Sequence, residues 1–295
     1  MPRIITNYAT LDYFSENTAQ TVISNVAQTT LRETLGITKD AYQGGYRIGE
    51  RLTYIVQIVS TGQNPSSLTV VDDLGTFAEN GVMYTPLDYE SYLLYVGQTL
   101  NPETGGVNVT VNVQPGSVRF TFDNLPTPFP GMTLLMQMRV NRFAPFSLSS
   151  QGITNTTELV VGGETVASDS ATVLLQSYAD LRILKSMTPD PVTQGETLTY
   201  TFVICNYGTA SPDSVTLRDR FNPAPAAPLE VKVDGETVDL FDYDPSTGMF
   251  VLGAAATQPY TFVLPPAGSV RDTQTGVVTV QASKLTVTVS GVIAQ

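Results

Sequence analysis

Apolar and polar side chains alternate along many short stretches of the chain. The two clearest stretches carry apolar residues at every second position, namely Leu52, Tyr54, Val56 and Ile58, and Leu198, Tyr200, Phe202 and Ile204. A period of two places successive side chains on opposite faces of an extended strand, as in a strand buried on one side. Turn-forming segments rich in Gly, Pro and Asn separate these stretches. No part of the sequence has the pattern of a long amphipathic helix. We therefore predict an all-β protein.

An internal repeat divides the chain. Residues 39–73 align without a gap with residues 185–219, and the matching pairs include Lys39/Lys185, Gly49/Gly195, Glu50/Glu196 and Asp73/Asp219. Both copies contain the motif Gly-Glu-x-Leu-Thr-Tyr. A length of 295 residues is itself typical of two domains. The repeat therefore predicts two homologous immunoglobulin-like Greek-key β-sandwiches in tandem.

A shorter repeat concerns a strand hairpin. Residues 5–11 resemble residues 153–159, and each segment precedes a polar turn and a second strand. The internal copy follows the strand at residues 132–138, so we interpret it as the last two strands of the first domain. The second domain ends with the counterpart of that strand, at residues 285–293. We therefore predict an N-terminal hairpin at 1–34, a sandwich at 35–179, and a sandwich at 180–295 that lacks its final hairpin.

The two repeats resemble a known family. The motif around Lys39, Gly49 and Asp73, repeated from Lys185 onwards, is similar to the conserved β-sandwich repeat of bacterial surface proteins called domain of unknown function eleven. The resemblance implies immunoglobulin-like domains that occur in tandem in surface and adhesive proteins. Short two-repeat members that begin with Ile-Thr-Asn-x-Ala, as here, are similar to proteins of spore-forming Gram-positive bacteria. No signal peptide and no sorting motif is visible, so the export route is left open.

A sandwich without its last strands exposes an apolar groove and unpaired edge groups, which favours a strand from another chain. We expect the N-terminal hairpin to supply that strand through one face, composed of Ile5, Asn7, Ala9, Leu11 and Tyr13. The interface is heterologous, so its repetition gives an open head-to-tail fibre of identical subunits, with a surface anchor or tip protein as a further partner. Alternatives are a hairpin that folds onto its own chain, a frayed terminus, and a monomeric spacer.

Residues suited to an isopeptide bond occur on the predicted inner faces of both repeats. Lys39 and Lys185 are in phase with apolar neighbours, and so are Asn7 and Asn155 on the hairpins. Glu50 and Glu196 are in phase with the apolar faces that start at Leu52 and Leu198. Burial favours a neutral amine and a protonated acid, which suits attack of a lysine on an asparagine amide. We predict bonds from Lys39 to Asn155 and from Lys185 to Asn7 of the next subunit. The assisting acids that we expect are Glu50 and Glu196, or else Asp73 and Asp219; the alternative is a lysine that reaches solvent and an asparagine that bonds to backbone.

Composition limits the remaining functions. The net charge is −12, with no histidine, no tryptophan and one cysteine, Cys205. An acidic chain without histidine is unsuited to nucleic acid, to anionic membranes and to most catalytic or metal sites, so we expect no enzyme, no cofactor and no metal. We predict a structural subunit of a fibre on the cell or spore surface. The alternative is a monomeric adhesin or carbohydrate-binding module that uses the Tyr-rich segment 83–95. Cys205 fits a small core or edge residue, and pairing between chains is the alternative.

Overall fold

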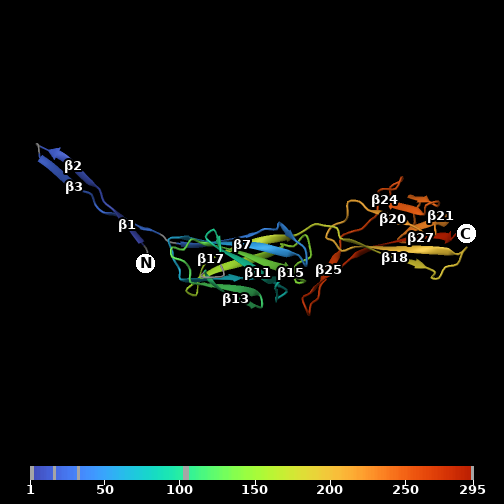
Figure 1. The fold of residues 1–295 in the computed structure, drawn as a ribbon, viewed down its shortest axis with the longest axis horizontal. Coiled ribbons are helices and arrows are strands. Elements are labelled where there is room, and N and C mark those ends of the chain that lie inside the picture. The colour runs from blue at the N-terminus through green and yellow to red at the C-terminus, as the bar shows by residue number, and fades with distance from the viewer. Residues whose placement is uncertain (1–2, 16–17, 32–33, 102–105, 294–295) are drawn as a thin grey trace. The chain divides into compact units, whose positions relative to one another are not determined.

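The computed structural model describes residues 3–15, 18–31, 34–101 and 106–293, and every regular element in these ranges is a β-strand. The predicted all-β class is therefore confirmed. Two compact units are present: unit 1 comprises residues 1–141 and 153–173, and unit 2 comprises residues 142–152 and 174–295. The ribbon in Figure 1 runs from the N-terminal strands in blue through unit 1 to the red strands of unit 2.

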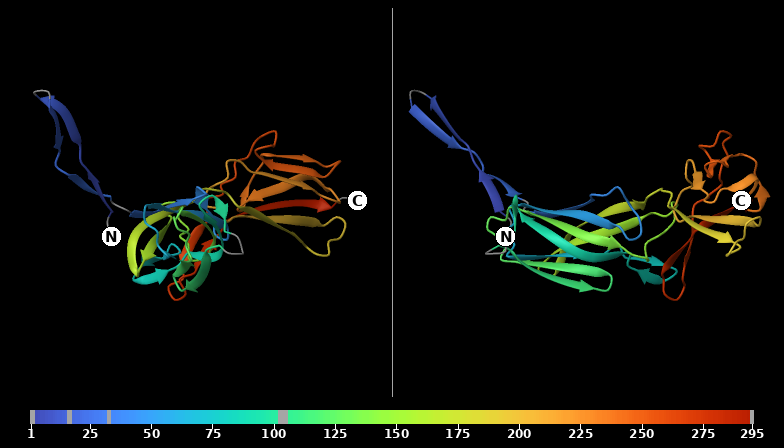
Figure 2. Two further views of the ribbon diagram at one scale, coloured as in Figure 1. Left: turned by 60° about the vertical axis from the view of Figure 1, so that its left-hand side comes forward. Right: turned by 45° about the vertical axis from the view of Figure 1, so that its right-hand side comes forward.

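Four strands form a two-part hairpin at the N-terminus. Its strands are β1 (Arg3–Asn7), β2 (Thr10–Ser15), β3 (Thr18–Ile23) and β4 (Ala27–Leu31). β1 pairs with β4 and β2 pairs with β3, both antiparallel, and these four strands pair with no other described strand. The hairpin is the blue ribbon in Figure 2.

Unit 1 contains two antiparallel sheets. The first has five strands, in the spatial order β12 (Thr99–Leu100), β11 (Leu87–Val96), β15 (Met132–Val140), β7 (Arg51–Thr61) and β5 (Thr34–Ala41). The second has six strands, in the order β13 (Asn108–Gln114), β14 (Ser117–Asp123), β8 (Ser67–Asp72), β16 (Ile153–Val161), β17 (Glu164–Leu175) and β6 (Gly45–Tyr46). A small separate pair consists of β9 (Phe77–Glu79) and β10 (Val82–Tyr84).

Unit 2 repeats the first of these sheets strand for strand. Its order is β18 (Leu181–Thr188), β19 (Thr197–Asn206), β27 (Ser283–Ile293), β21 (Pro225–Val233) and β22 (Glu236–Thr237). The facing sheet has three strands, in the order β20 (Thr216–Arg220), β24 (Met249–Gly253) and β23 (Phe241–Asp244). A further hairpin consists of β25 (Gly268–Arg271) and β26 (Val278–Gln281).

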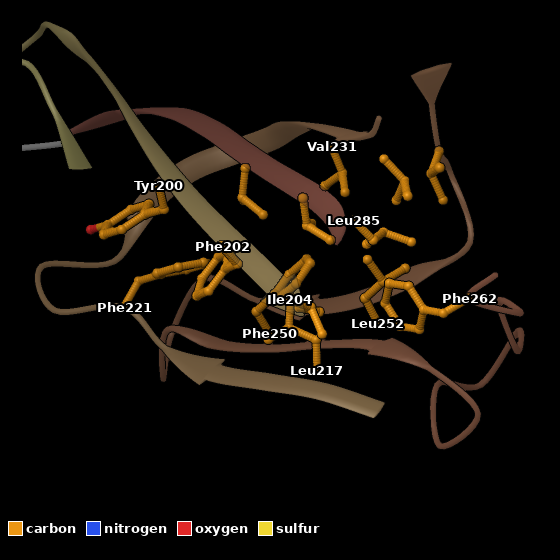
Figure 3. Packing of buried hydrophobic residues seen from close by; sticks show 14 of the residues in the cluster. Tyr200, Phe202, Ile204, Leu217, Phe221, Val231, Phe250, Leu252, Phe262 and Leu285 are labelled. Atoms are coloured by element: carbon orange, nitrogen blue, oxygen red, sulfur yellow. The ribbon is translucent and has the colours of Figure 1, made fainter. Parts of the chain in front are cut away.

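The alternating apolar residues of β7 and β19 form part of the core of each sandwich. Leu52, Tyr54, Val56 and Ile58 of β7 are all at most 1% exposed, and the matching apolar positions of β19 are also buried. In unit 2, Figure 3 shows Phe202 and Ile204 near Phe250 of the opposite sheet, while Tyr200 lies beside Phe221. Two β-sandwiches of the predicted immunoglobulin-like class therefore form, each with a core between facing sheets.

The Gly-Glu motif has one backbone role in both units. Gly49 and Gly195 adopt φ of +89° and +88°, a conformation that suits glycine because it has no Cβ. The amide of Gly49 donates to the Val140 carbonyl, and that of Gly195 donates to the Ile293 carbonyl. The motif therefore joins the start of β7 or β19 to the neighbouring strand, which explains its repetition.

Candidate assembly site

Three polar side chains meet in the interior of unit 1. Lys39 on β5 donates from Nζ to Asp72 Oδ2 on β8 at 2.5 Å and to Thr157 Oγ1 on β16 at 2.7 Å. Thr157 Oγ1 in turn donates to Asp72 Oδ2 at 2.8 Å. The side chains of Lys39 and Asp72 are fully buried. A buried charge is tolerated only when it is paired and hydrogen-bonded, and this centre meets both conditions.

Asn155 lies two residues before Thr157, on the same face of β16, and is fully buried. Its Oδ1 accepts a hydrogen bond from the backbone amide of Gly75 at 3.2 Å, and its Nδ2 lies 3.5 Å from Met138 Sδ. The predicted inner positions of Lys39 and Asn155 are thus found in the structure. The Gly75 amide polarises the Asn155 carbonyl in the direction that favours attack on its carbon.

Burial shifts the pKa values around this centre. Desolvation lowers the pKa of Lys39, although the Asp72 carboxylate acts in the opposite direction. Desolvation also raises the pKa of Asp73 and of Tyr54, whose ring lies 4.9 Å from Lys39 Nζ. The Tyr54 hydroxyl makes no hydrogen bond of good geometry with any described residue, but the Asn155 amide is near enough to lower its pKa in part. A lowered lysine pKa increases the share of neutral, nucleophilic amine.

The expected assisting acids lie elsewhere. Glu50 is at the surface, 4.0 Å from Arg47, because it precedes β7 and the alternation of that strand does not reach it. Glu196 is also exposed and accepts a hydrogen bond from the backbone amide of Thr193, which lowers its pKa. Neither glutamate contacts a lysine through any described hydrogen bond. Asp72 stands beside Lys39 instead.

Of the alternative acids, Asp73 and Asp219, the first is replaced by its neighbour Asp72. The ungapped repeat alignment matches Asp73 with Asp219, but Asp73 turns away from Lys39 and accepts hydrogen bonds from the amides of Gly75 and Thr156. Asp219 instead corresponds to Asp72, since Lys185 Nζ donates to Asp219 Oδ2 at 2.5 Å, as Lys39 does to Asp72. One additional residue between β19 and β20 accounts for the displacement.

The lysine centre of unit 2 is open to solvent. The Lys185 side chain is 42% exposed, whereas that of Lys39 is completely buried. Lys185 packs over the ring of Tyr200 at 5.0 Å, and Asp219 is its ion-pair partner. The difference from the predicted burial has a physical cause, because in unit 1 it is β16 that covers the equivalent lysine.

The same difference extends along the whole of β18. Leu35 and Ile37 on β5 are 8% and 7% exposed, but their counterparts Leu181 and Ile183 on β18 are 38% and 52% exposed. Every residue of β18 is exposed. The inner face of this strand therefore carries apolar side chains that lack cover in the described chain.

An unpaired strand edge lies opposite that face. In unit 1, β8 pairs with β14 on one side and with β16 on the other. In unit 2, its counterpart β20 pairs only with β24, and among residues 34–101 and 106–293 no strand occupies the position of β16. This edge carries backbone groups that are free of strand pairing in the described chain, and it lies beside the uncovered apolar residues of β18.

The side chains of the predicted donor face are all exposed. Ile5, Leu11 and Tyr13 are 50%, 65% and 44% exposed, and Asn7 and Ala9 are exposed as well. Their strands therefore present apolar residues without a core of their own in the described chain. The structure does not bring Asn7 and Lys185 into contact through any described interaction.

The structure also places the Tyr-rich segment and the single cysteine. In the Tyr-rich segment 83–95, Tyr84 is buried, and the half-buried Tyr89 and Tyr92 pack edge-on against Phe120. Cys205 is a free thiol, buried in β19. Within the described ranges no group of three or more metal-ligating side chains forms. No helix there has the length and apolar composition needed to span a membrane.

Comparison with known proteins gives likenesses of structure alone. No family model matches the chain, and no curated protein matches it in sequence. The major pilin subunit BcpA of Bacillus cereus aligns over 95% of this chain and 81% of its own, with 11% identity and a TM-score of 0.33. The T6 backbone pilin of Streptococcus pyogenes aligns over 90% and 65%, with 8% identity and a TM-score of 0.37.

An adhesin is also among the similar structures. The N-terminal domain of the Streptococcus gordonii adhesin Sgo0707 aligns over 54% of this chain, with 18% identity and a TM-score of 0.32. This chain spans 37% of the length of that structure. The assignment to the repeat family of bacterial surface proteins stays a prediction from the sequence motifs.

Proposed function

We propose that this protein is a structural subunit of an extracellular fibre on the cell or spore surface. Subunits join head to tail when the N-terminal hairpin of one molecule completes unit 2 of the next. The observation that carries the proposal is the open edge of β20, which lies beside the exposed residues Ile183 and Lys185. The hairpin has the strand arrangement and the apolar residues to fill that position.

The equivalent place in unit 1 supports the proposal. There β16 pairs with β8, β17 pairs with the outer side of β16, and β16 covers Lys39. Burial of the exposed apolar side chains of β18 and of the hairpin stabilises such an interface by about 25 cal/mol for each Å² of apolar surface removed from water. Because the two contacting surfaces differ, each added subunit presents a new free surface, and the assembly is an open fibre as long as the rotation between subunits does not close a ring.

The proposal includes covalent bonds at the two lysine centres. The neutral Nζ of Lys39 attacks the Asn155 Cγ carbon, an amide bond forms, and the Asn155 nitrogen leaves as ammonia. Asp72 takes the proton from Nζ and transfers it to the leaving nitrogen, so atoms and charge balance. Between subunits, Lys185 and Asn7 take the same roles, with Asp219 as the acid.

Electron microscopy of the purified protein, beside denaturing gels of the same sample, tests the assembly. We expect fibres from the full chain and none from a variant lacking residues 1–34. As a control for the truncation, the hairpin of the full chain is expected to resist proteolysis in the fibre and to be cleaved in the free subunit. Fibres formed by the truncated variant would overturn the proposal. A monodisperse full-length monomer would instead favour a hairpin folded onto its own chain.

Intact mass spectrometry tests the covalent part separately. Each isopeptide bond removes the mass of one ammonia, and a Lys39→Arg variant serves as the control that cannot form the first bond. An unchanged mass in the monomer excludes the bond within unit 1. A fibre that dissolves to monomers in denaturant keeps strand addition and excludes the bond between subunits.

A further inference from the structure

Strands β16 and β17 show how a hairpin completes this type of sandwich. β16 pairs antiparallel with β8, with Thr157 opposite Asp72 and Leu159 opposite Val70. β17 follows on the outer side of β16, with Asn155 opposite Ala171. These pairs fix both the depth and the register of the hairpin in unit 1.

The receiving strand of unit 2 is aligned by its own side chains. Asp219 binds Lys185 as Asp72 binds Lys39, and the neighbouring inner residue of β20 is the buried Leu217, where β8 has Val70. The same number of residues separates Asp72 from Asp219 and Val70 from Leu217, so the two strands align without a gap. The edge of β20 therefore matches that of β8 residue by residue.

The N-terminal hairpin copies the pairing of β16 with β17. In unit 1 Ile153 lies opposite Val173 and Asn155 opposite Ala171. In the hairpin Ile5 lies opposite Thr29, and Asn7 lies opposite Ala27, so the same Asn–Ala pair recurs at the same distance from the isoleucine. The irregularities differ in position, because the one in unit 1 follows Leu159, whereas in the hairpin residues 8–9 separate β1 from β2, at the positions that correspond to Thr156 and Thr157.

Combining these two correspondences gives one register, which rests on the head-to-tail assembly proposed above. We infer that Leu11 of one subunit lies opposite Leu217 of the next and that Ala9 lies opposite Asp219. Asn7 then reaches the end of β20 beside Lys185. On the outer face, the same register places Thr10 opposite Arg218.

The charges on the outer face agree with this register. Arg218 and Arg220 point away from the core of unit 2, so β20 carries a basic edge in a chain whose net charge is −12. Asp12 lies on the corresponding outer face of β2 and comes diagonally beside Arg218. Opposite charges at diagonal cross-strand positions stabilise a pairing, and a slip of one residue would turn Asp12 to the core face and lose this contact.

One substitution between the two hairpins has a chemical consequence. Thr157 in unit 1 provides a hydroxyl to both Lys39 and Asp72, whereas its counterpart in the donor hairpin is Ala9. Without that hydroxyl, the Asn7 amide is the polar group that the donor presents to Lys185 and Asp219. An Ala9→Thr variant restores the unit 1 arrangement only in the inferred register.

Engineered disulfides test the register in the assembled protein. Directly opposite residues have Cβ atoms about 4.5–5.5 Å apart and diagonal ones about 7–8 Å, so only an opposite pair closes readily. In a Cys205→Val background we introduce Thr10→Cys with Arg218→Cys, and as matched controls Thr10→Cys with Arg220→Cys or with Thr216→Cys. All these positions lie on the outer face and leave the core unchanged.

We expect fibres of the Arg218→Cys combination to give a covalent ladder on a non-reducing gel, and at least tenfold less from the two controls. A ladder from either control would overturn the register while keeping fibre assembly, and so would fibres in which no combination forms a ladder. A cross-linked band that migrates as a monomer would show closure onto the same chain and overturn the assembly. Absence of fibres from the Cys205→Val parent and the wild type would overturn the proposed function itself.

The Ala9→Thr variant gives an independent measurement. The comparison is made in an Asn7→Ala background, which cannot form the bond between subunits. In the inferred register the new hydroxyl contacts Lys185 and Asp219, so these fibres dissociate at a higher denaturant concentration than fibres of the Asn7→Ala parent. A Thr10→Val variant on the outer face is the control for a change in β-propensity. No shift for Ala9→Thr, or an equal shift for both variants, would contradict the register.

Discussion

Ile37 and Ile183 occupy equivalent positions on β5 and β18, yet Ile37 is 7% exposed and Ile183 is 52% exposed. The difference gives a matched pair of variants. Ile37→Ala leaves a cavity in a packed core and is expected to cost unit 1 about 2–5 kcal/mol. Ile183→Ala in the free subunit is expected to change unit 2 by less than about 1 kcal/mol, while weakening fibre assembly. Calorimetry of the two unfolding transitions measures both effects; a large loss for Ile183→Ala in the monomer would show that the position is already covered.

The buried ion pair of Lys39 and Asp72 is predicted to be strongly coupled. Lys39→Met leaves a buried carboxylate without its cation and is expected to cost about 3–5 kcal/mol in the free energy of unfolding. The double variant Lys39→Met/Asp72→Asn is expected to cost much less than the sum of the single variants. Denaturant unfolding of the four proteins in this double-mutant cycle gives the coupling energy. Additive effects would mean that the two groups do not interact.

The Tyr54 hydroxyl is buried without a hydrogen bond of good geometry in the described chain. Removing an unsatisfied polar atom relieves a desolvation cost. Tyr54→Phe is therefore expected to leave the free energy of unfolding of unit 1 within about 1 kcal/mol of the wild type, or to raise it. A loss of more than about 2 kcal/mol would instead show that the hydroxyl holds Asn155.

Hydrogen exchange is predicted to distinguish β20 from β8. β8 is paired on both sides and β20 on one, so amides that point from β20 toward the open edge exchange quickly in the monomer. On assembly they gain partners, and their exchange is expected to slow to the rate of the β8 amides. Mass spectrometry of peptides covering the two strands, before and after assembly, measures this change. Unaltered exchange of β20 in fibres would contradict strand addition at this edge.

Two turn carboxylates predict a loss of stability of unit 2 in acid. Hydrogen bonds from the side chain of Ser246 lower the pKa of Asp244, and those from the backbone and side chain of Thr275 lower the pKa of Asp272. Because both pKa values are lower in the folded state, the stabilisation is present above the unfolded pKa of about 3.9 and is lost as the pH falls through the folded values. The melting temperature of an Asp244→Asn/Asp272→Asn variant should therefore lie under that of the wild type at neutral pH and approach it as the pH falls through the lowered pKa values of the folded state. A constant difference across this range would contradict the assignment.

The residues that sequence analysis located correctly are those on regular strands. Alternation around Leu52 and Leu198 predicted the two core strands, and the phase of Lys39 with its apolar neighbours predicted a buried lysine. The prediction that Glu50 faces the core was wrong, because the alternation of β7 was extended back into the preceding turn, where side chains no longer alternate. A pattern of period two carries no information beyond the end of its strand.

Asp72 was missed for a different reason. An ungapped alignment matched Asp73 with Asp219, while one added residue before β20 shifts the true correspondence to Asp72. The exposure of Lys185 also depends on a contact with another strand, which local patterning does not report. Adjacent residues of a strand point to opposite faces, so an error of one position is decisive. Asp72 faces the core and binds Lys39, whereas Asp73 accepts hydrogen bonds from backbone amides of the turn and of β16.

The hairpin and the open edge of β20 are two different surfaces of the same subunit, and this difference gives the proposed fibre a direction. A filament built from this contact carries an unused hairpin at one terminus and an unfilled sandwich at the other. The two termini therefore differ in chemistry, elongation is polar, and a single molecule that imitates the hairpin suffices to stop growth at one end while leaving the other active.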